Sequence, residues 1–173
     1  MERMFRDLKA EEIDVRIAQL GNGWLSLLLY KDARVDMDIL DETVGPMNWQ
    51  RKHTRDNANC IIEIWDKGKG QWISKEDTGT ESFTEKEKGL ASDSFKRSGF
   101  NWGIGRELYT GPKIFIQGVD DKGQSNYETK EVKGKMQCKT TFYVEAIQIE
   151  NKVITGLAIK NNKNKIVFIY KKG

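Results

Sequence analysis

Three consecutive strand-like segments followed by one amphipathic helix constrain the fold of this chain more than any other sequence feature. Alternating residues between turn signals predict strands at 49–56, 58–66 and 71–76. A capping-box pattern at residues 84–87 predicts the start of a helix that ends near Phe100. Since both kinds of element need a partner for their apolar side, the sequence favours an α+β fold in which they pack together.

The predicted helix separates its apolar residues from its charged ones. Helical spacing gives a core-facing stripe of Leu90, Ala91, Ser94, Phe95 and Ser98. The other face carries Lys86, Gly89, Asp93, Lys96 and Arg97. Two adjacent cations on a packed helix, with aromatic residues close by, suit the phosphates and bases of a single-stranded nucleic acid. A solvated or intersubunit face with an i,i+4 ion pair from Asp93 to Arg97 explains the same residues.

Most of the remaining sequence predicts strands. The turn Gly21-Asn-Gly23 joins an alternating segment at 13–17 to an apolar run at 24–30, which indicates a hairpin. Asp32 is a suitable cap for a helix that ends before Gly45. The other expected elements are a short helix at 5–12, a strand at 114–117, a mobile loop at 118–138, and strands at 140–149, 153–159 and 165–170.

The composition is that of a soluble globular protein. Of the 173 residues 38% are hydrophobic and 32% are charged, which allows a buried core and argues against disorder. No apolar run reaches the length of a membrane span, and the N-terminus lacks the apolar segment of a secretory signal. With only two cysteines, Cys60 and Cys138, we expect a cytoplasmic protein without disulfide bonds.

Charge is unevenly distributed along the chain. The net charge is +3, but residues 1–110 contain 17 Lys and Arg against 20 Asp and Glu, whereas residues 111–173 contain 12 against 6. The basic C-terminal part is expected either to attract phosphate in a salt-sensitive way or to serve solubility and discourage edge pairing.

The residue pattern gives little indication of a metal-binding or nucleotide-binding site. His53 is the single histidine, so a zinc site is excluded. The acidic residues within 36–42 would be the ligands of a metal-dependent nuclease, but successive helical positions point in different directions. Residues 118–125 have the glycine spacing of a phosphate-binding loop, with Gln124 where lysine is required. We therefore expect no cofactor, no metal and no enzymatic activity.

Four segments occur in an order that resembles a known family. They read YKDARVDMDILDETVGPMNW at 30–49, KED at 75–77, EKGLASDSFKR at 87–97 and WGIGRELY at 102–109. Together they resemble the Rad-fifty-two-type single-strand annealing proteins, in particular the short phage and bacterial members. The resemblance extends over roughly residues 13–109.

This resemblance implies a fold, an activity and partners. It implies a β-β-β-α core, assembled into a ring or helical multimer whose positive groove holds single-stranded DNA with its bases exposed. Such proteins anneal complementary strands without ATP or metal in homologous recombination and DNA repair. The annealing core would be residues 1–110, and residues 111–173 would be a basic β-rich extension packed on or beside it. A phage or host single-strand-binding protein or exonuclease is a further implied partner.

The resemblance also assigns residues to the groove. Its Lys-Arg pair matches Lys96 and Arg97, and Arg34 is the nearest match to a basic residue at the start of the earlier helix. An additional arginine of the eukaryotic members is replaced here by Phe100. From the residue pattern alone, the further DNA-binding candidates are Arg51, Lys52, Arg55, Lys86 and Arg106.

Several alternatives remain open at this level. Alternation places Arg51, His53 and Arg55 on one side of their strand and Lys52 on the other, where an exposed edge explains them as well as a groove does. The large aromatic residues are expected in the core more often than under bases; they are Tyr30, Trp49, Trp65, Trp72 and Trp102. The competing functions are a passive single-strand binder, a metal-dependent nuclease and a purely structural oligomer.

Overall fold

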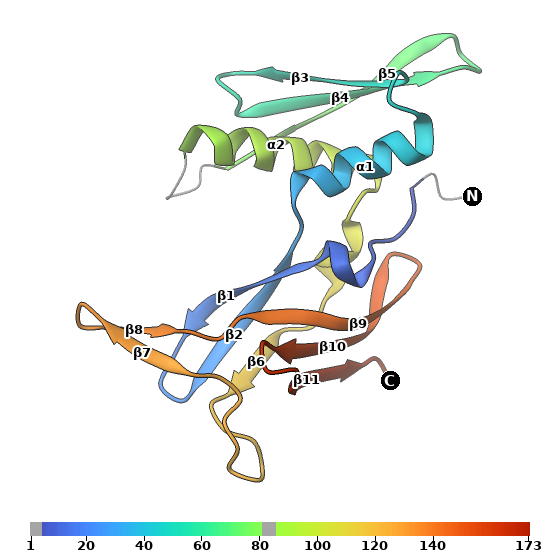
Figure 1. Ribbon diagram of the computed structural model, residues 1–173. Helices are drawn as coiled ribbons and strands as arrows, with labels where there is room; N and C mark the ends of the chain where they lie inside the picture. The colour runs from blue at the N-terminus through green and yellow to red at the C-terminus, as the bar shows by residue number, and fades with distance from the viewer. Residues whose placement is uncertain (1–4, 81–85) are drawn as a thin grey trace. The chain divides into compact units, whose positions relative to one another are not determined.

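The computed structural model describes residues 5–80 and 86–173 and has a mixed α+β fold (Figure 1). The chain forms two compact units. The first contains Asp32–Arg106 and the described part of the N-terminal segment up to Asp7, and the second contains Leu8–Lys31 and Glu107–Gly173. The first hairpin of the chain thus belongs with the C-terminal strands, whereas the sequence suggested one core for residues 1–110.

The first unit is an antiparallel three-stranded sheet with two helices. The sheet has the order β3-β4-β5, formed by Trp49–Thr54, Asn59–Asp66 and Gln71–Thr78. Helix α1, Ala33–Val44, precedes the sheet in sequence, and helix α2, Lys86–Trp102, follows it. The capping residue Thr84, predicted to start the second helix, lies outside the described residues. The three strands and the two helices otherwise agree with the sequence prediction to within a few residues.

Helix α2 packs against the sheet at unusually short distance because small residues line the contact. Phe95 is the largest fully buried side chain of the helix. Beside it, the Ser98 hydroxyl donates to the Lys75 carbonyl at 2.8 Å and accepts from the Ile62 amide at 3.2 Å. A Cβ at Gly79, after β5, would lie 2.6 Å from the Ser94 amide nitrogen. The backbone of α2 therefore lies directly against the backbone of the segment that follows β5.

Helix α1 begins and ends as its sequence predicts. The Asp32 carboxylate accepts a hydrogen bond from the Arg34 amide at 2.8 Å, which caps the N-terminus. The helix ends at Gly45, whose φ of 87° is unfavourable for other residues. Ile39 and Leu40 are fully buried. The helix contacts α2 at Asp36, because a Cβ added to Gly99 would lie 2.7 Å from the Asp36 carboxylate.

The second unit is a six-stranded antiparallel sheet of order β11-β10-β9-β1-β2-β6. Its two outer strands, β6 and β11, contact each other, so the sheet curls around one apolar core. The core includes Leu25, Ile116, Phe142 and Ile154. The strands are β1 Asp14–Leu20, β2 Trp24–Tyr30, β6 Ile114–Gln117, β9 Phe142–Glu150, β10 Val153–Asn161 and β11 Ile166–Lys171; single 3-10 turns lie at Ala10–Glu12 and Arg106–Thr110.

The segment predicted as a mobile loop at 118–138 contains a hairpin instead. Its strands are β7, Thr129–Val132, and β8, Lys135–Cys138. The short helix expected at 5–12 is reduced to the 3-10 turn at Ala10–Glu12, since Lys9 before it has extended backbone with φ −88° and ψ 158°. None of the helices in the described parts of the chain is long and apolar enough to cross a membrane.

The close contact at Gly79 predicts a large cost for a single methyl group. We expect Gly79→Ala to lower the free energy of unfolding by about 1–3 kcal/mol, because the new Cβ forces β5 and α2 apart. Gly68→Ala is the matched control, since its Cβ would meet only the exposed Asp66 carboxylate, at 3.3 Å. Urea denaturation measures both variants. Equal stability of the two would show that the helix can shift away from the strand without cost.

Candidate nucleic-acid interface

Lys96 and Arg97 lie on α2 outside the buried stripe that packs against the sheet. Their neighbours Ser94, Phe95 and Ser98 are fully buried, whereas Lys96 and Arg97 are both half-buried. Consecutive helical residues differ by about 100° in direction, so the two cations diverge from each other along this face. Helix α2 thus presents them as the sequence predicted, and the packing of its buried stripe fixes the helix that carries them.

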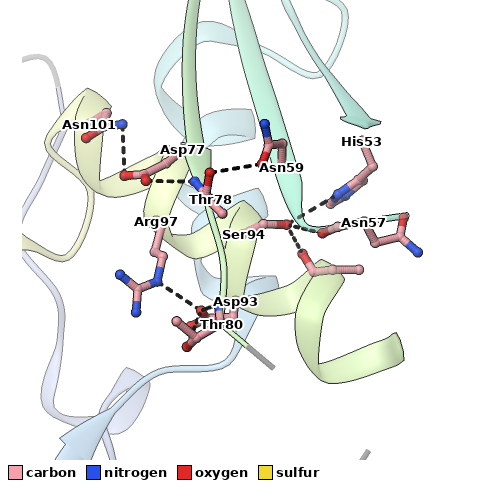
Figure 2. Close-up of polar contacts among 11 residues, drawn as sticks. His53, Asn57, Asn59, Asp77, Thr78, Thr80, Asp93, Ser94, Arg97 and Asn101 are labelled. Carbon is pink, nitrogen blue, oxygen red and sulfur yellow. Dashed lines mark hydrogen bonds and ion pairs between the residues drawn. The ribbon is translucent and has the colours of Figure 1, made fainter. Parts of the chain in front are cut away.

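Arg97 forms an ion pair with Asp93, one turn earlier (Figure 2). Its Nε donates to the Asp93 carboxylate at 2.9 Å, and the Thr80 amide donates to the same oxygen at 2.8 Å. Burial by itself would raise the pKa of Asp93, but the Thr80 amide, the Arg97 hydrogen bond and the charges of Arg97 and Lys96 together lower it. Asp93 is therefore ionised at neutral pH and partly compensates the positive charge of this face.

The basic strand β3 divides its cations between two faces, as alternation predicts. Lys52 lies on the face away from α2 and pairs with Glu63 at 2.9 Å. Arg51 lies on the other face, with its guanidinium 4.8 Å from the centre of the Phe95 ring. Arg55 has left the strand for the turn after it, where its φ is 53°. The three cations of this segment therefore do not form one row, and Arg51 is the one that contacts α2.

The other predicted cations have different positions. Arg34 is 85% exposed on the first turn of α1, with its Nε 3.5 Å from Asp32. Helix α2 begins at Lys86, whose side chain lies outside the described part of the structure. Arg106 donates to the carbonyls of Phe100 and Asn101 at 2.8 and 3.0 Å, so it satisfies acceptors at the end of α2. Arg106 is thus engaged in closing the helix.

Lys75 is a cation that the sequence analysis did not place among the candidates. Its ammonium group donates to the Asn101 carbonyl at 2.9 Å and lies 4.7 Å from the centre of the Trp102 ring. Phe100, which replaces a cation in the resemblance, is half-buried below the Arg106 guanidinium at 5.5 Å. Both contacts hold the C-terminal turn of α2, and only the tertiary fold brings these residues together.

The large aromatic residues of the first unit occupy two environments. Trp49 packs against Phe95 with ring centres 6.2 Å apart, and Trp102 donates its indole N–H to the Ile62 carbonyl. Trp65 and Trp72 meet edge to face on the outer side of the sheet, where they are 36% and 38% exposed. Trp49 and Trp102 are thus half-buried against α2 and β4 rather than in the core, while Trp65 and Trp72 are accessible.

His53 lies on the α2 side of β3, with Nδ1 3.4 Å from the Ser94 hydroxyl (Figure 2). Burial, and then the charge of Arg51, lower the pKa of His53 below its ordinary value, although a hydrogen bond with the Asn59 backbone raises it. The imidazole is therefore held neutral at physiological pH.

The acidic residues of α1 are directed to separate partners. Asp41 accepts the indole N–H of Trp49 at 2.6 Å, and Glu42 accepts from Arg6 at 2.7 Å. Asp36 is fully buried against α2, and Asp38 is exposed. Among the described residues, no group of three or more His, Cys, Asp or Glu side chains is arranged to hold a metal ion. The geometry of α1 thus gives the nuclease hypothesis no convergent carboxylates.

Comparison of the chain with protein-family models, curated proteins and solved structures found no match. The functional assignment therefore depends on the residues and geometry described above.

The lowered pKa of His53 predicts a specific pH dependence of stability. The unfolded chain binds the His53 proton more readily than the native state, so the free energy of unfolding decreases as pH falls through the ordinary histidine pKa of about 6.5. His53→Asn should remove this component and so show a weaker decrease between about pH 7.5 and 5.5. Urea unfolding of both proteins across this interval is the measurement. Identical pH dependence would contradict the assignment.

Proposed function

We propose that this protein binds single-stranded DNA and anneals complementary strands without ATP, as a multimer with a positively charged groove, in homologous recombination or DNA repair. The observation that carries the proposal is the half-buried pair Lys96–Arg97 on α2, next to the buried residues that pack this helix against a three-stranded sheet. The order of these elements is the one that the sequence resemblance implies. We therefore propose that the DNA-binding groove implied by the resemblance includes Lys96 and Arg97.

The electrostatics of the face support contact with phosphates. Lys96 and Arg97 stand on a helix whose other side is held by buried contacts, so their backbone positions are fixed before a ligand binds. Fixed cations neutralise phosphate at a lower entropic cost than cations on mobile segments. The Arg34 side chain is 85% exposed. Its helix, α1, contacts α2 where Asp36 meets Gly99. We include Arg34 as a third contact.

The proposed mechanism requires no covalent step. Phosphates bind along the cationic face, repulsion between two strands decreases, and base pairing supplies the free energy of annealing. The candidate residues accordingly serve to position charge rather than to transfer protons or groups. Because the phosphate contacts release counterions, the affinity of the protein for DNA should fall steeply with salt concentration.

The double substitution Lys96→Ala/Arg97→Ala tests the groove. We expect a loss of about tenfold or more in single-strand affinity and a reduction of about two in the slope of log K against log salt, with unchanged fold and oligomeric state. The control is Lys171→Ala/Lys172→Ala, which removes two adjacent exposed cations elsewhere. Fluorescence anisotropy with a labelled oligonucleotide gives the affinity. A dissociated multimer with normal DNA affinity per subunit would assign the pair to a subunit interface instead.

Annealing is separated from passive binding by a second assay. Complementary labelled oligonucleotides are mixed with the protein in the absence of nucleotide and metal ions, and duplex formation is followed by fluorescence transfer. The proposal expects faster pairing than in protein-free controls. Binding without acceleration would reduce the function to protection of single strands.

Removing the charge of Asp93 is expected to strengthen the binding of single-stranded DNA. Since its carboxylate is ionised and pairs with Arg97, it opposes phosphate at the same position. Asp93→Asn should raise single-strand affinity by roughly threefold to fivefold, the effect of about one additional charge contact. Asp38→Asn makes the same charge change at an exposed site on α1 and serves as the control. An equal gain in both variants would indicate a general effect of net charge, and the role of Asp93 would be refuted.

A further inference from the structure

We propose that the β7–β8 hairpin is a second nucleic-acid contact, which places its basic face in the major groove of a B-form DNA duplex. This site lies in the second unit and involves none of the residues assigned to the single-strand groove. It does not depend on the annealing function, because a duplex is recognised here by a separate element. The contacts of the hairpin carry the inference.

The hairpin is formed by local geometry rather than by an apolar core. Lys133 and Gly134 connect the paired residues Val132 and Lys135, and their φ values of 50° and 74° are both positive. A two-residue loop with positive φ at both positions matches the twist of the strands it joins. The strands themselves are mostly exposed, with Val132 and Cys138 half-buried. An isolated two-stranded ribbon of this kind is marginal in water, so it needs a firm base.

The base of the hairpin supplies that support. The Lys139 amide donates to the Glu128 carbonyl at 2.8 Å, which continues the ladder by one pair. The Glu128 amide in turn donates to the Thr140 hydroxyl at 2.8 Å. Next to these residues, Tyr127 belongs to the buried core, and Cys138 packs against it. The hairpin is therefore a firmly attached arm, and Figure 1 shows it extending from the sheet of the second unit.

The pairing register separates the lysines from the side that meets the core. Lys130 pairs with Gln137 and Val132 pairs with Lys135, so these four residues share one face. Thr129, Glu131, Met136 and Cys138 share the other face, and Cys138 anchors that face to the core. Lys130, Lys135 and Gln137 are exposed on the first of these faces, and Val132 lies half-buried among them. Lys133 extends this face to the tip, and Lys139 extends it toward the base.

These lysines differ from their neighbours in the same unit. Lys160 pairs with Glu145, Lys163 with Glu128 and Lys165 with Asp120. Within the described residues, no ion pair is formed by Lys130, Lys133, Lys135 or Lys139. The charge of Lys139 acts on Glu128, whose pKa it helps to lower. Lys130, Lys133 and Lys135 give the exposed ribbon an excess of positive charge, and an anionic partner relieves their mutual repulsion.

The shape of the hairpin selects a duplex among anionic partners. Its two strands lie about 4.8 Å apart, so the ribbon with side chains fits the major groove of B-form DNA, which is about 12 Å wide and admits a two-stranded β-ribbon. Lysines on one face, at the tip and toward the base then reach phosphates of the groove walls. A single strand offers no groove for the ribbon to enter.

The test compares duplex and single-strand affinity in one variant. Lys133→Asn/Lys135→Gln removes two charges, and asparagine before glycine keeps the turn favourable, so the hairpin is retained. We expect duplex affinity to fall about tenfold to thirtyfold, with a salt slope lower by about two, while single-strand affinity is unchanged. The probes are a short blunt-ended duplex of mixed sequence and one of its strands. The control, Lys67→Gln/Lys69→Gln, alters two lysines in the turn between β4 and β5.

Each outcome decides the proposal. It is overturned if the wild-type protein fails to bind the duplex at low salt, if the hairpin variant behaves like the control, or if both probes lose affinity equally. Loss of duplex binding alone supports it. The Lys96→Ala/Arg97→Ala variant separates this result from the proposed annealing function, because it should lose the single strand and keep the duplex.

Discussion

The close contact between α2 and the β3-β4-β5 sheet is the constraint on which the first unit depends. The contact is possible because Gly79, Ser94 and Ser98 have little or no side-chain volume where helix and strand meet. The serine hydroxyls then bond to backbone groups, which leaves few polar atoms unsatisfied in a tight interface. Since this side of the helix packs against the sheet, Lys96 and Arg97 lie outside the buried stripe.

Carboxylates reduce the positive charge that the basic residues give to the candidate interface. Arg97 is paired with Asp93, so the number of basic residues on α2 overstates its positive potential. On the opposite face of the sheet, Lys52 is paired with Glu63 in the same way. Asp93 is held in place by the Thr80 amide, which makes it a fixed part of the surface. In such a pair a phosphate can replace the carboxylate without leaving the guanidinium unpaired, which fits the proposed binding and release of DNA.

Sequence patterns predicted those elements whose signals are local. The three strands and α2 follow from alternation, turn residues and one apolar stripe, and the exposure of Lys96 and Arg97 follows from the same stripe. The pairing of the first hairpin with β9 did not follow, because a single residue pair, Asp14 with Tyr143, joins segments far apart in the chain. The β7–β8 hairpin was missed because its strands are polar and its stability comes from a turn and a buried base.

The small number of cations on the interface argues for repetition. Lys96 and Arg97 together neutralise about two phosphates, and Asp93 offsets part of that, so one subunit would hold a single strand only weakly at physiological salt. Several subunits along one strand convert later contacts into intramolecular ones, and the affinities then multiply. The proposed groove would therefore retain a single strand only if several subunits bound the same strand. The same reasoning explains why each subunit can keep the carboxylate of Asp93. Weak contacts in each subunit would let the DNA strand shift register during pairing, and the contacts of all subunits together would keep the strand bound.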